Sequence, residues 1–189
     1  MSQAIVIATT PSRYDFLKNC MDTLEGYDKY PIIILSDYTY GEGKIDRIIN
    51  HTDIEEFTLI ADSMEILDPT MFDILFQTYQ GQSVSYYKVP QTMYMGLGKY
   101  KSAVLRKLPI DWNIKTFDKS DAVSQTIGGF YLKEDPDMAY LLPDTAEWET
   151  GTFIEKFGRK NMVVKNDYFI KYKGHWSAET LPYRHVTRT

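Results

Sequence analysis

The stretch FTLIADSMEIL, residues 57–67, decides the fold. Four of its first five residues are apolar, and the run stops at Asp62 rather than at a glycine or an asparagine. A continuous apolar run of this length is typical of a strand covered on both faces, as in a parallel sheet. The stretch PIIILSD, residues 31–37, repeats the pattern and also ends on a carboxylate, Asp37. Packing alone does not require a carboxylate at the end of a buried strand, so both aspartates are candidate ligand-binding residues.

Strands and helices alternate through the first half of the chain. Apolar runs predict further strands at 4–8 and 83–89. A helix with Ser12 as its N-cap and Gly26 at its end is expected after the first strand. A second helix is expected at 43–50, and a third begins with Asp68 as its cap and a proline in its first turn. The alternation predicts an α/β fold with a Rossmann-like, mainly parallel sheet flanked by helices.

Polar residues follow three of these strands in turn. Thr9 and Thr10 follow the first strand, Asp37 the second and Asp62 the third. Ligands of parallel α/β sheets bind at the carboxyl ends of the strands. The sequence therefore predicts a binding site at this edge.

The second half of the chain is less regular. Residues 93–110 are expected to form a small glycine loop followed by a helix, and 118–144 an irregular polar segment. A helix is predicted over 147–157 with Gly158 after it, and one or two strands over 161–177. Because no repeat or linker is evident, we expect a single domain over 1–189.

Composition narrows the class of protein. The chain has 189 residues, of which 43% are hydrophobic, and a formal charge of −5 that argues against a dominant nucleic-acid surface. A single cysteine, Cys20, excludes a disulfide within the chain and fits a reducing compartment. The sequence opens without the pattern of a signal peptide, and no apolar run is long enough for a transmembrane segment. We therefore expect a soluble, cytoplasmic protein.

The order of these motifs resembles the GT-A fold of nucleotide-sugar glycosyltransferases, in particular the inverting, family-two-like members. The stretch LIADSMEIL resembles the strand that carries the DxD motif of that family, and MGLGKYKSAVLRKL its glycine loop and following helix. AEWETGTFIEKFG resembles the segment with the catalytic base, and KGHWS lies where the family often places a metal-binding histidine. The resemblance implies a nucleotide-binding half at 1–95 and an acceptor and catalytic half at 96–189.

The resemblance also implies roles for individual residues. A UDP-sugar donor and an acceptor hydroxyl are implied, the acceptor being a glycan, a lipid-linked sugar, a protein or a modified nucleic acid. Mn²⁺ or Mg²⁺ is implied on Asp62 and His175, where it offsets charge on the departing diphosphate. Glu147 is implied as the catalytic base, with Glu149 as the alternative. The donor-binding residues implied are Thr9, Thr10, Pro11, Arg13, Asp37, Asp62, Ser63, Gly96 and Gly98.

Several alternatives stay open at the level of sequence. The DxD motif keeps one carboxylate, since it reads Ala61-Asp62-Ser63, and Asp62 is also well suited to capping a turn at a strand end. Acids at 147 and 149 also suit the first turn of a helix, where they stabilise its dipole. Arg13 and Lys101 fit a solvated surface as well as a phosphate site. A non-catalytic nucleotide-sugar-binding module and a sugar nucleotidyltransferase remain the alternative functions, although the loop after the first strand lacks the glycines of the latter.

Overall fold

The computed structural model describes residues 1–39, 41–88, 97–114, 139–145, 148–149 and 162–173. Its main feature is a six-stranded sheet in the order β2-β1-β3-β6-β5-β7. β1 runs parallel to β2 and β3, β6 is antiparallel to both of its neighbours, and β7 is parallel to β5. Among the described strands of this sheet, only β6 therefore runs in the opposite direction. The predicted α/β fold with a mainly parallel sheet is confirmed. The strands are β1 (Gln3–Thr9), β2 (Ile32–Ser36), β3 (Glu56–Ala61), β5 (Val84–Lys88), β6 (Gly98–Lys101) and β7 (Ala139–Thr145).

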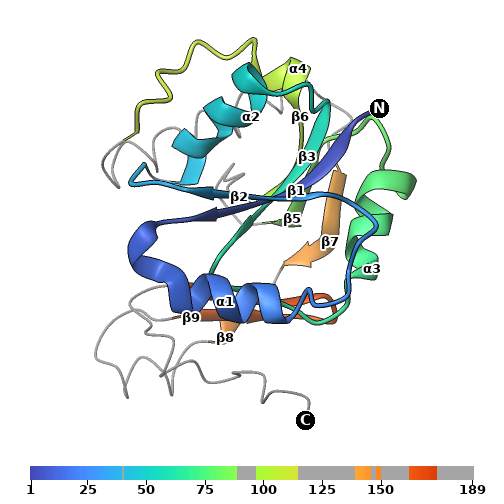
Figure 1. Cartoon of the computed structure of the whole chain (residues 1–189). Coiled ribbons are helices and arrows are strands. Elements are labelled where there is room, and N and C mark those ends of the chain that lie inside the picture. The colour runs from blue at the N-terminus through green and yellow to red at the C-terminus, as the bar shows by residue number, and fades with distance from the viewer. Residues whose placement is uncertain (40, 89–96, 115–138, 146–147, 150–161, 174–189) are drawn as a thin grey trace.

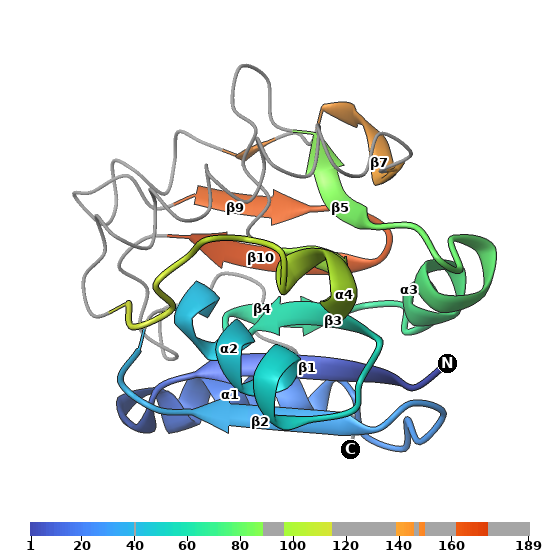
Figure 2. The same cartoon turned by 90° about the horizontal axis from the view of Figure 1, so that it is seen from above.

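A second, antiparallel sheet has the order β4-β10-β9-β8. Its strands are β4 (Met64–Ile66), β8 (Trp148–Glu149), β9 (Met162–Lys165) and β10 (Phe169–Lys173). β4 follows β3 after a two-residue turn, so the chain passes directly from the main sheet into the small one at Asp62 and Ser63. Figure 2 shows β9 and β10 beside this junction.

Short helices cover both faces of the main sheet. Figure 1 shows α1 on one face and α2 with α4 on the other. The helices are α1 (Tyr14–Asp22) after the short helix η1 (Pro11–Arg13), α2 (Ile45–His51) after η2 (Gly41–Lys44), α3 (Thr70–Asp73) continued by η3 (Ile74–Thr78), and α4 (Ser102–Leu105). The predicted third helix is present, but its N-cap residue is Pro69 rather than Asp68, whose carboxylate accepts the Thr70 backbone N–H at 2.9 Å from one residue earlier.

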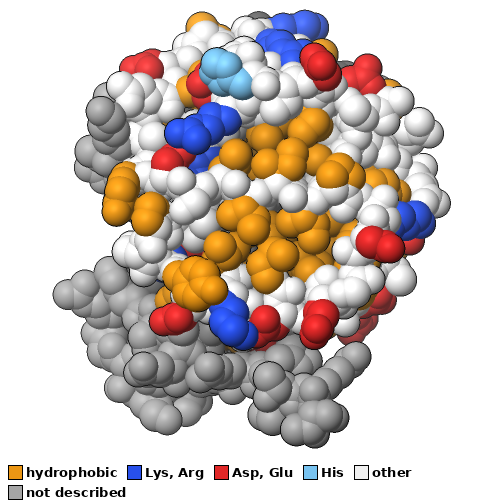
Figure 3. All heavy atoms as spheres, viewed as in Figure 1, with side chains coloured by type: hydrophobic (Ala, Val, Ile, Leu, Met, Phe, Trp, Pro, Cys, Tyr) orange, Lys and Arg blue, Asp and Glu red, His pale blue; other side chains and the backbone are white. Residues whose placement is uncertain are grey.

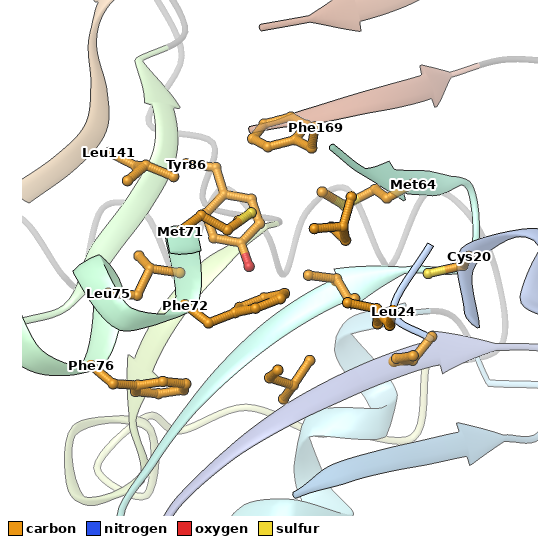
Figure 4. Packing of buried hydrophobic residues seen from close by; sticks show 14 of the residues in the cluster. Cys20, Leu24, Met64, Met71, Phe72, Leu75, Phe76, Tyr86, Leu141 and Phe169 are labelled. Carbon is orange, nitrogen blue, oxygen red and sulfur yellow. The ribbon is translucent and has the colours of Figure 1, made fainter. Parts of the chain in front are cut away.

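Alternate residues of β1 enter two separate cores. Ile5 and Ile7 pack with Cys20 of α1 and with Leu24 in the turn after it, and this core extends to α3 and to the second sheet (Figure 4). Val6 packs on the opposite face, in the core that contains the apolar side of α2 and part of α4. Because successive side chains of a strand point to opposite faces, the continuous apolar run of β1 fills both cores.

The sheet order reverses at β1. The chain passes from β1 through α1 to β2 on one side, then returns through α2 to β3 on the other side of β1. The two connecting helices lie on opposite faces, as right-handed crossovers in opposite directions require. The carboxyl ends of β1 and β3 therefore form a topological switch point, the place where open α/β sheets bind ligands. Figure 1 shows this edge opposite the N terminus.

The structure corrects several local predictions. Ser12 does not cap the first helix, because Arg13 is the N-cap residue of α1 and no side chain bonds the cap. Trp148 and Glu149 pair with β9 as a strand rather than forming part of the predicted helix, whose other residues, 147 and 150–157, lie outside the described part of the chain. The predicted irregular segment ends in a strand, β7. Two strands, β9 and β10, form where one or two were expected.

β2 lies at an edge of the main sheet and leaves an apolar surface. Its Ile34 side chain is 43% exposed, and neighbouring residues on both faces of the strand are half-buried. Figure 3 shows apolar side chains gathered over this side of the molecule. Among the helices that the structure describes, none combines the length and apolar character needed to cross a bilayer.

Candidate functional site at the strand ends

Asp62 lies at the switch point and is held by β1. Its backbone N–H donates to the Ala8 carbonyl at 3.1 Å, which continues the β1–β3 ladder by one residue. Its side chain is 5% exposed, and Oδ2 accepts a hydrogen bond from the Thr9 hydroxyl at 2.8 Å. The two strand ends predicted to share a site are therefore joined directly.

Arg13 forms an ion pair with Asp62. Nε donates to Oδ2 at 2.8 Å and Nη2 donates to Oδ1 at 2.9 Å, so the guanidinium grips both carboxylate oxygens. The guanidinium also lies 4.1 Å from the centre of the Phe16 ring, a cation–π contact that fixes its orientation. The Arg13 side chain remains 36% exposed. Bidentate arginine–carboxylate pairs are among the strongest hydrogen-bonded pairs in proteins, and this one ties the β1–α1 loop to the end of β3.

Asp37 is the charged residue at the end of β2. Oδ1 accepts from the backbone N–H of Thr39 at 2.8 Å and also from the Thr39 hydroxyl, while the Lys44 ammonium lies 3.2 Å away. Arg47 Nη2 is 3.2 Å from Oδ2, but that contact lacks hydrogen-bond geometry, and Oδ2 is left without a hydrogen-bond partner among the described residues. Partial burial raises the pKa of Asp37, but the bonds from Thr39 and Lys44 outweigh it and bring the pKa below its usual range. Asp37 is therefore ionised at neutral pH, and its Oδ2, buried beside the Arg47 guanidinium, accepts no hydrogen bond from the described residues.

Ser63 and Glu65 connect the site to the second sheet. The Lys171 ammonium of β10 donates to the Ser63 hydroxyl and to the Tyr172 carbonyl, the latter at 3.0 Å. Glu65 is fully buried, and its Oε1 accepts from Asn19 at 2.8 Å and from the Tyr172 hydroxyl at 2.9 Å. Its Oε2 has no hydrogen-bond partner within the described residues. Sequence analysis missed this group, because its members lie 46 and 107 positions apart.

The register of the second sheet relates Glu149 to the same site. Glu149 pairs with Val163, Val163 pairs with Tyr172, and the Tyr172 backbone N–H donates to the Ser63 carbonyl at 3.0 Å. These four backbones therefore form one row across the sheet. Three strand spacings separate its ends, a distance of about 14 Å. β9 and β10 occupy this span, so a sugar that reaches both ends of the row must lie over one face of the second sheet.

Two exposed tyrosines flank the strand ends and were also missed. Tyr38 follows Asp37 and is 75% exposed, and Tyr14 follows Arg13 and is 69% exposed. Exposed large hydrophobic residues are uncommon in the described part of the molecule. Besides these two tyrosines, they are Met1 and Ile34. An exposed aromatic ring beside a polar edge provides a surface on which a nucleobase can stack.

The remaining predicted residues divide into those beside the edge and those away from it. Thr10 and Pro11 belong to the turn before α1, where the Thr10 carbonyl accepts the Arg13 N–H at 2.9 Å. Gly98 is the first residue of β6 rather than part of a loop, and a Cβ atom there would lie 2.2 Å from the Val84 carbonyl oxygen. Lys101 pairs with Glu56 at the opposite edge of the sheet. Gly96, Glu147 and His175 lie outside the described residues, as does the Glu149 side chain.

The residues around Asp62 do not fit a divalent cation. Both carboxylate oxygens already accept charged hydrogen bonds from Arg13, and a metal at the same oxygens would lie against the guanidinium. The described residues contain no cluster of three or more histidine, cysteine or acidic side chains that suits a metal ion. Because His175 lies outside them, Mn²⁺ or Mg²⁺ shared between Asp62 and His175 stays a prediction.

Cys20 lies behind the site but is not suited to act as a nucleophile. Burial, together with the nearby charges of Asp62 and Glu65, raises the pKa of its thiol to about 12, and the opposing effect of Lys171 is smaller. Its sulfur lies 3.9 Å from the Ala61 carbonyl oxygen. Since the thiolate is the reactive form, this cysteine serves as a core residue.

Comparisons with known proteins show the fold. The sequence matches no family model and no curated protein. A197 from STIV superposes with a TM-score of 0.50 over 92% of this chain and 96% of A197, at 12% identity. TarS of S. aureus superposes with a TM-score of 0.46 over 68% of this chain, at 11% identity. The chain covers 33% of the length of TarS. A glycosyltransferase involved in the glycosylation of the major capsid of PBCV-1 superposes with a TM-score of 0.46, at 13% identity. The superposition covers 75% of this chain and 82% of that glycosyltransferase. At 12% identity the likeness to A197 is one of fold alone.

Proposed function

We propose that the protein is a glycosyltransferase that moves a sugar from a nucleotide-diphosphate donor, a UDP-sugar, to an acceptor hydroxyl. The observation that carries the proposal is the meeting of Thr9, Arg13 and Asp62 at the switch point of the sheet, with Asp37 at the neighbouring strand end. Polar side chains in this position are the usual nucleotide-binding groups of open α/β sheets. The order of the sequence motifs supports a sugar nucleotide over other nucleotides.

The nucleoside is assigned to the end of β2. An ionised aspartate at the end of a strand next to β1 is suited to accept hydrogen bonds from ribose hydroxyls or from a base N–H. The free capacity of Asp37 Oδ2 fits this role, and the half-exposed Arg47 beside it is able to move aside. Tyr38 then offers its exposed ring to the base. The diphosphate extends from there toward Arg13 and Ser63.

The acceptor is assigned to the side of the second sheet. Direct displacement at the anomeric carbon needs a base that takes the proton of the acceptor hydroxyl as the new bond forms. Glu147 and Glu149 are the proposed bases, and the row from Ser63 to Glu149 supports the second of them, since it puts the Glu149 backbone about 14 Å from the proposed diphosphate site in the same small sheet. Inversion at the anomeric carbon follows from a single displacement.

Calorimetric titration with UDP tests the proposal. We expect wild-type protein to bind UDP and to release UDP slowly when it is given UDP-sugars. Tyr38→Ala should weaken UDP binding by about ten-fold, since base–aromatic stacking contributes about 1–3 kcal/mol. Ile34→Ala is the matched control, because it removes another exposed apolar side chain, from β2 itself, without facing the ligand.

The outcomes separate the candidate functions. No binding of UDP, GDP or CDP would contradict the proposal. Binding without turnover of any UDP-sugar would instead identify a nucleotide-sugar-binding module. Equal loss of affinity in Tyr38→Ala and Ile34→Ala would remove the assignment of the base to the end of β2.

A further inference from the structure

We infer that Arg13 takes the place of the divalent cation at Asp62, so that a nucleotide diphosphate binds to this protein without metal. The inference rests on the proposed function, because it concerns the same donor site. It departs from the expectation drawn from the sequence, in which Asp62 holds Mn²⁺ or Mg²⁺.

The first step is the occupancy of Asp62. A cation bound to this nearly buried carboxylate must either displace charged hydrogen bonds of 2.8 and 2.9 Å or share Oδ1 with the guanidinium, against its positive charge. The Thr9 hydroxyl occupies a third position on the same carboxylate at 2.8 Å. The Phe16 ring holds the guanidinium in place from another side. The positive charge that a metal would supply is already present in the protein.

The second step is the geometry of the guanidinium. Arginine carries five N–H donors in one plane. The pair with Asp62 uses the Nε hydrogen and one hydrogen on Nη2. The Nη1 group lies in the same plane, at the edge of the guanidinium that points away from the carboxylate. The side chain is 36% exposed, and we place a phosphate oxygen at these outer donors. Asp62 therefore orients Arg13 and leaves it able to donate to a phosphate oxygen.

The third step is a second cation beside the same turn. Lys171 contacts the Ser63 hydroxyl, so Asp62 and Ser63 have Arg13 on one side and Lys171 on the other. Two positively charged side chains, one on each side of the turn, are suited to bind the two charged phosphates of a nucleotide diphosphate. Such a site offsets the charge on the leaving diphosphate with the protein's own side chains.

The test compares UDP binding with and without metal by calorimetry. Wild-type protein should bind UDP with the same Kd, within about two-fold, in EDTA and in Mn²⁺. Arg13→Ala should weaken binding in EDTA by about ten-fold or more, since a hydrogen bond to a charged group contributes about 1.5–3 kcal/mol. Lys18→Ala is the control, because it removes one positive charge from α1, the helix that follows Arg13, at a residue paired with Asp22.

Each outcome bears on the inference. UDP binding that requires Mn²⁺ in the wild type would overturn it and leave the proposed function intact. Metal-independent binding that is unchanged in Arg13→Ala, while Lys18→Ala behaves like the wild type, would overturn the role of Arg13. Absence of UDP binding in both buffers would overturn the inference together with the proposed function. Circular dichroism checks folding, and Arg13→Gln replaces Arg13→Ala if the latter does not fold.

Discussion

At the scale of residues, the sequence identified the position of Asp62 but not its partner. A carboxylate directly after a buried strand is visible in the sequence, and so is the threonine pair after the first strand. The partner, Arg13, is 49 positions away and comes into contact only because β1 and β3 are neighbours. No local pattern distinguishes an arginine that pairs with a buried carboxylate from one on a solvated surface. The same reasoning explains why Lys171, Asn19 and Tyr172 were missed.

Cys20 gives a prediction at this scale. Because burial raises the pKa of its thiol to about 12, we expect no reaction with Ellman's reagent at pH 8 in the native protein. One thiol should react after denaturation, since the chain has a single cysteine. Rapid reaction of the native protein would show that the thiol is accessible or ionised, which contradicts the packing around α1.

The same thiol links stability to pH. Its pKa is raised on folding from 9.0, so the native state keeps a proton that the unfolded state releases. The contribution of Cys20 to the free energy of unfolding is therefore complete below pH 9 and is lost as the pH rises toward 12. In Cys20→Ala that part of the alkaline loss should be absent in urea titrations across this range.

At the scale of elements, the strands of the first half were predictable because continuous apolar runs are local signals. In the second half β9 and β10 were predicted, but β7 and β8 were not, since each is defined by its pairing with another strand rather than by a local apolar run. The sequence WET, residues 148–150, carries acids and an aromatic residue that suit a helix start as well as an edge strand. Trp148 pairs with Val164, so these residues form a strand, and no pattern within the segment itself predicts that pairing.

Gly98 provides the prediction for elements. Its missing side chain lets β6 approach β5, and a Cβ atom at this position would lie 2.2 Å from the Val84 carbonyl oxygen. Gly98→Ala should therefore lower the free energy of unfolding by about 3 kcal/mol, because neither backbone can move without breaking the ladder. Urea denaturation followed by circular dichroism measures this loss.

Gly26→Ala is the control for this experiment. Gly26 has a φ of 78° and open space around the position of a Cβ atom. Alanine there meets only the conformational cost of the left-handed region, about 1 kcal/mol. If Gly98→Ala cost no more than Gly26→Ala, the close packing of β5 against β6 would be contradicted.

At the scale of the whole molecule, the fold places the site. The reversal of strand order at β1 brings the ends of β1 and β3 together, and the end of β2 lies next to them. The sequence predicted this edge because it predicted parallel strands with polar ends. It did not predict that the chain continues from Asp62 into a second sheet whose last described strand contains Glu149. That connection, which brings a candidate base and a candidate donor site into one row, depends on the pairing of β4 with β10, in which Met64 lies opposite Lys171.

The most direct test of nucleotide binding at the strand ends is the change in backbone amide chemical shifts of ¹⁵N-labelled protein on addition of UDP. The proposed function predicts that the largest changes among the described residues fall after β1, β2 and β3, at 9–14, 37–39 and 62–63. Residues at the opposite edge of the sheet, such as Ser2, Glu55 and Gly81, should not change. Changes centred on that opposite edge, or none at all at saturating UDP, would contradict a nucleotide site at the carboxyl ends of the strands.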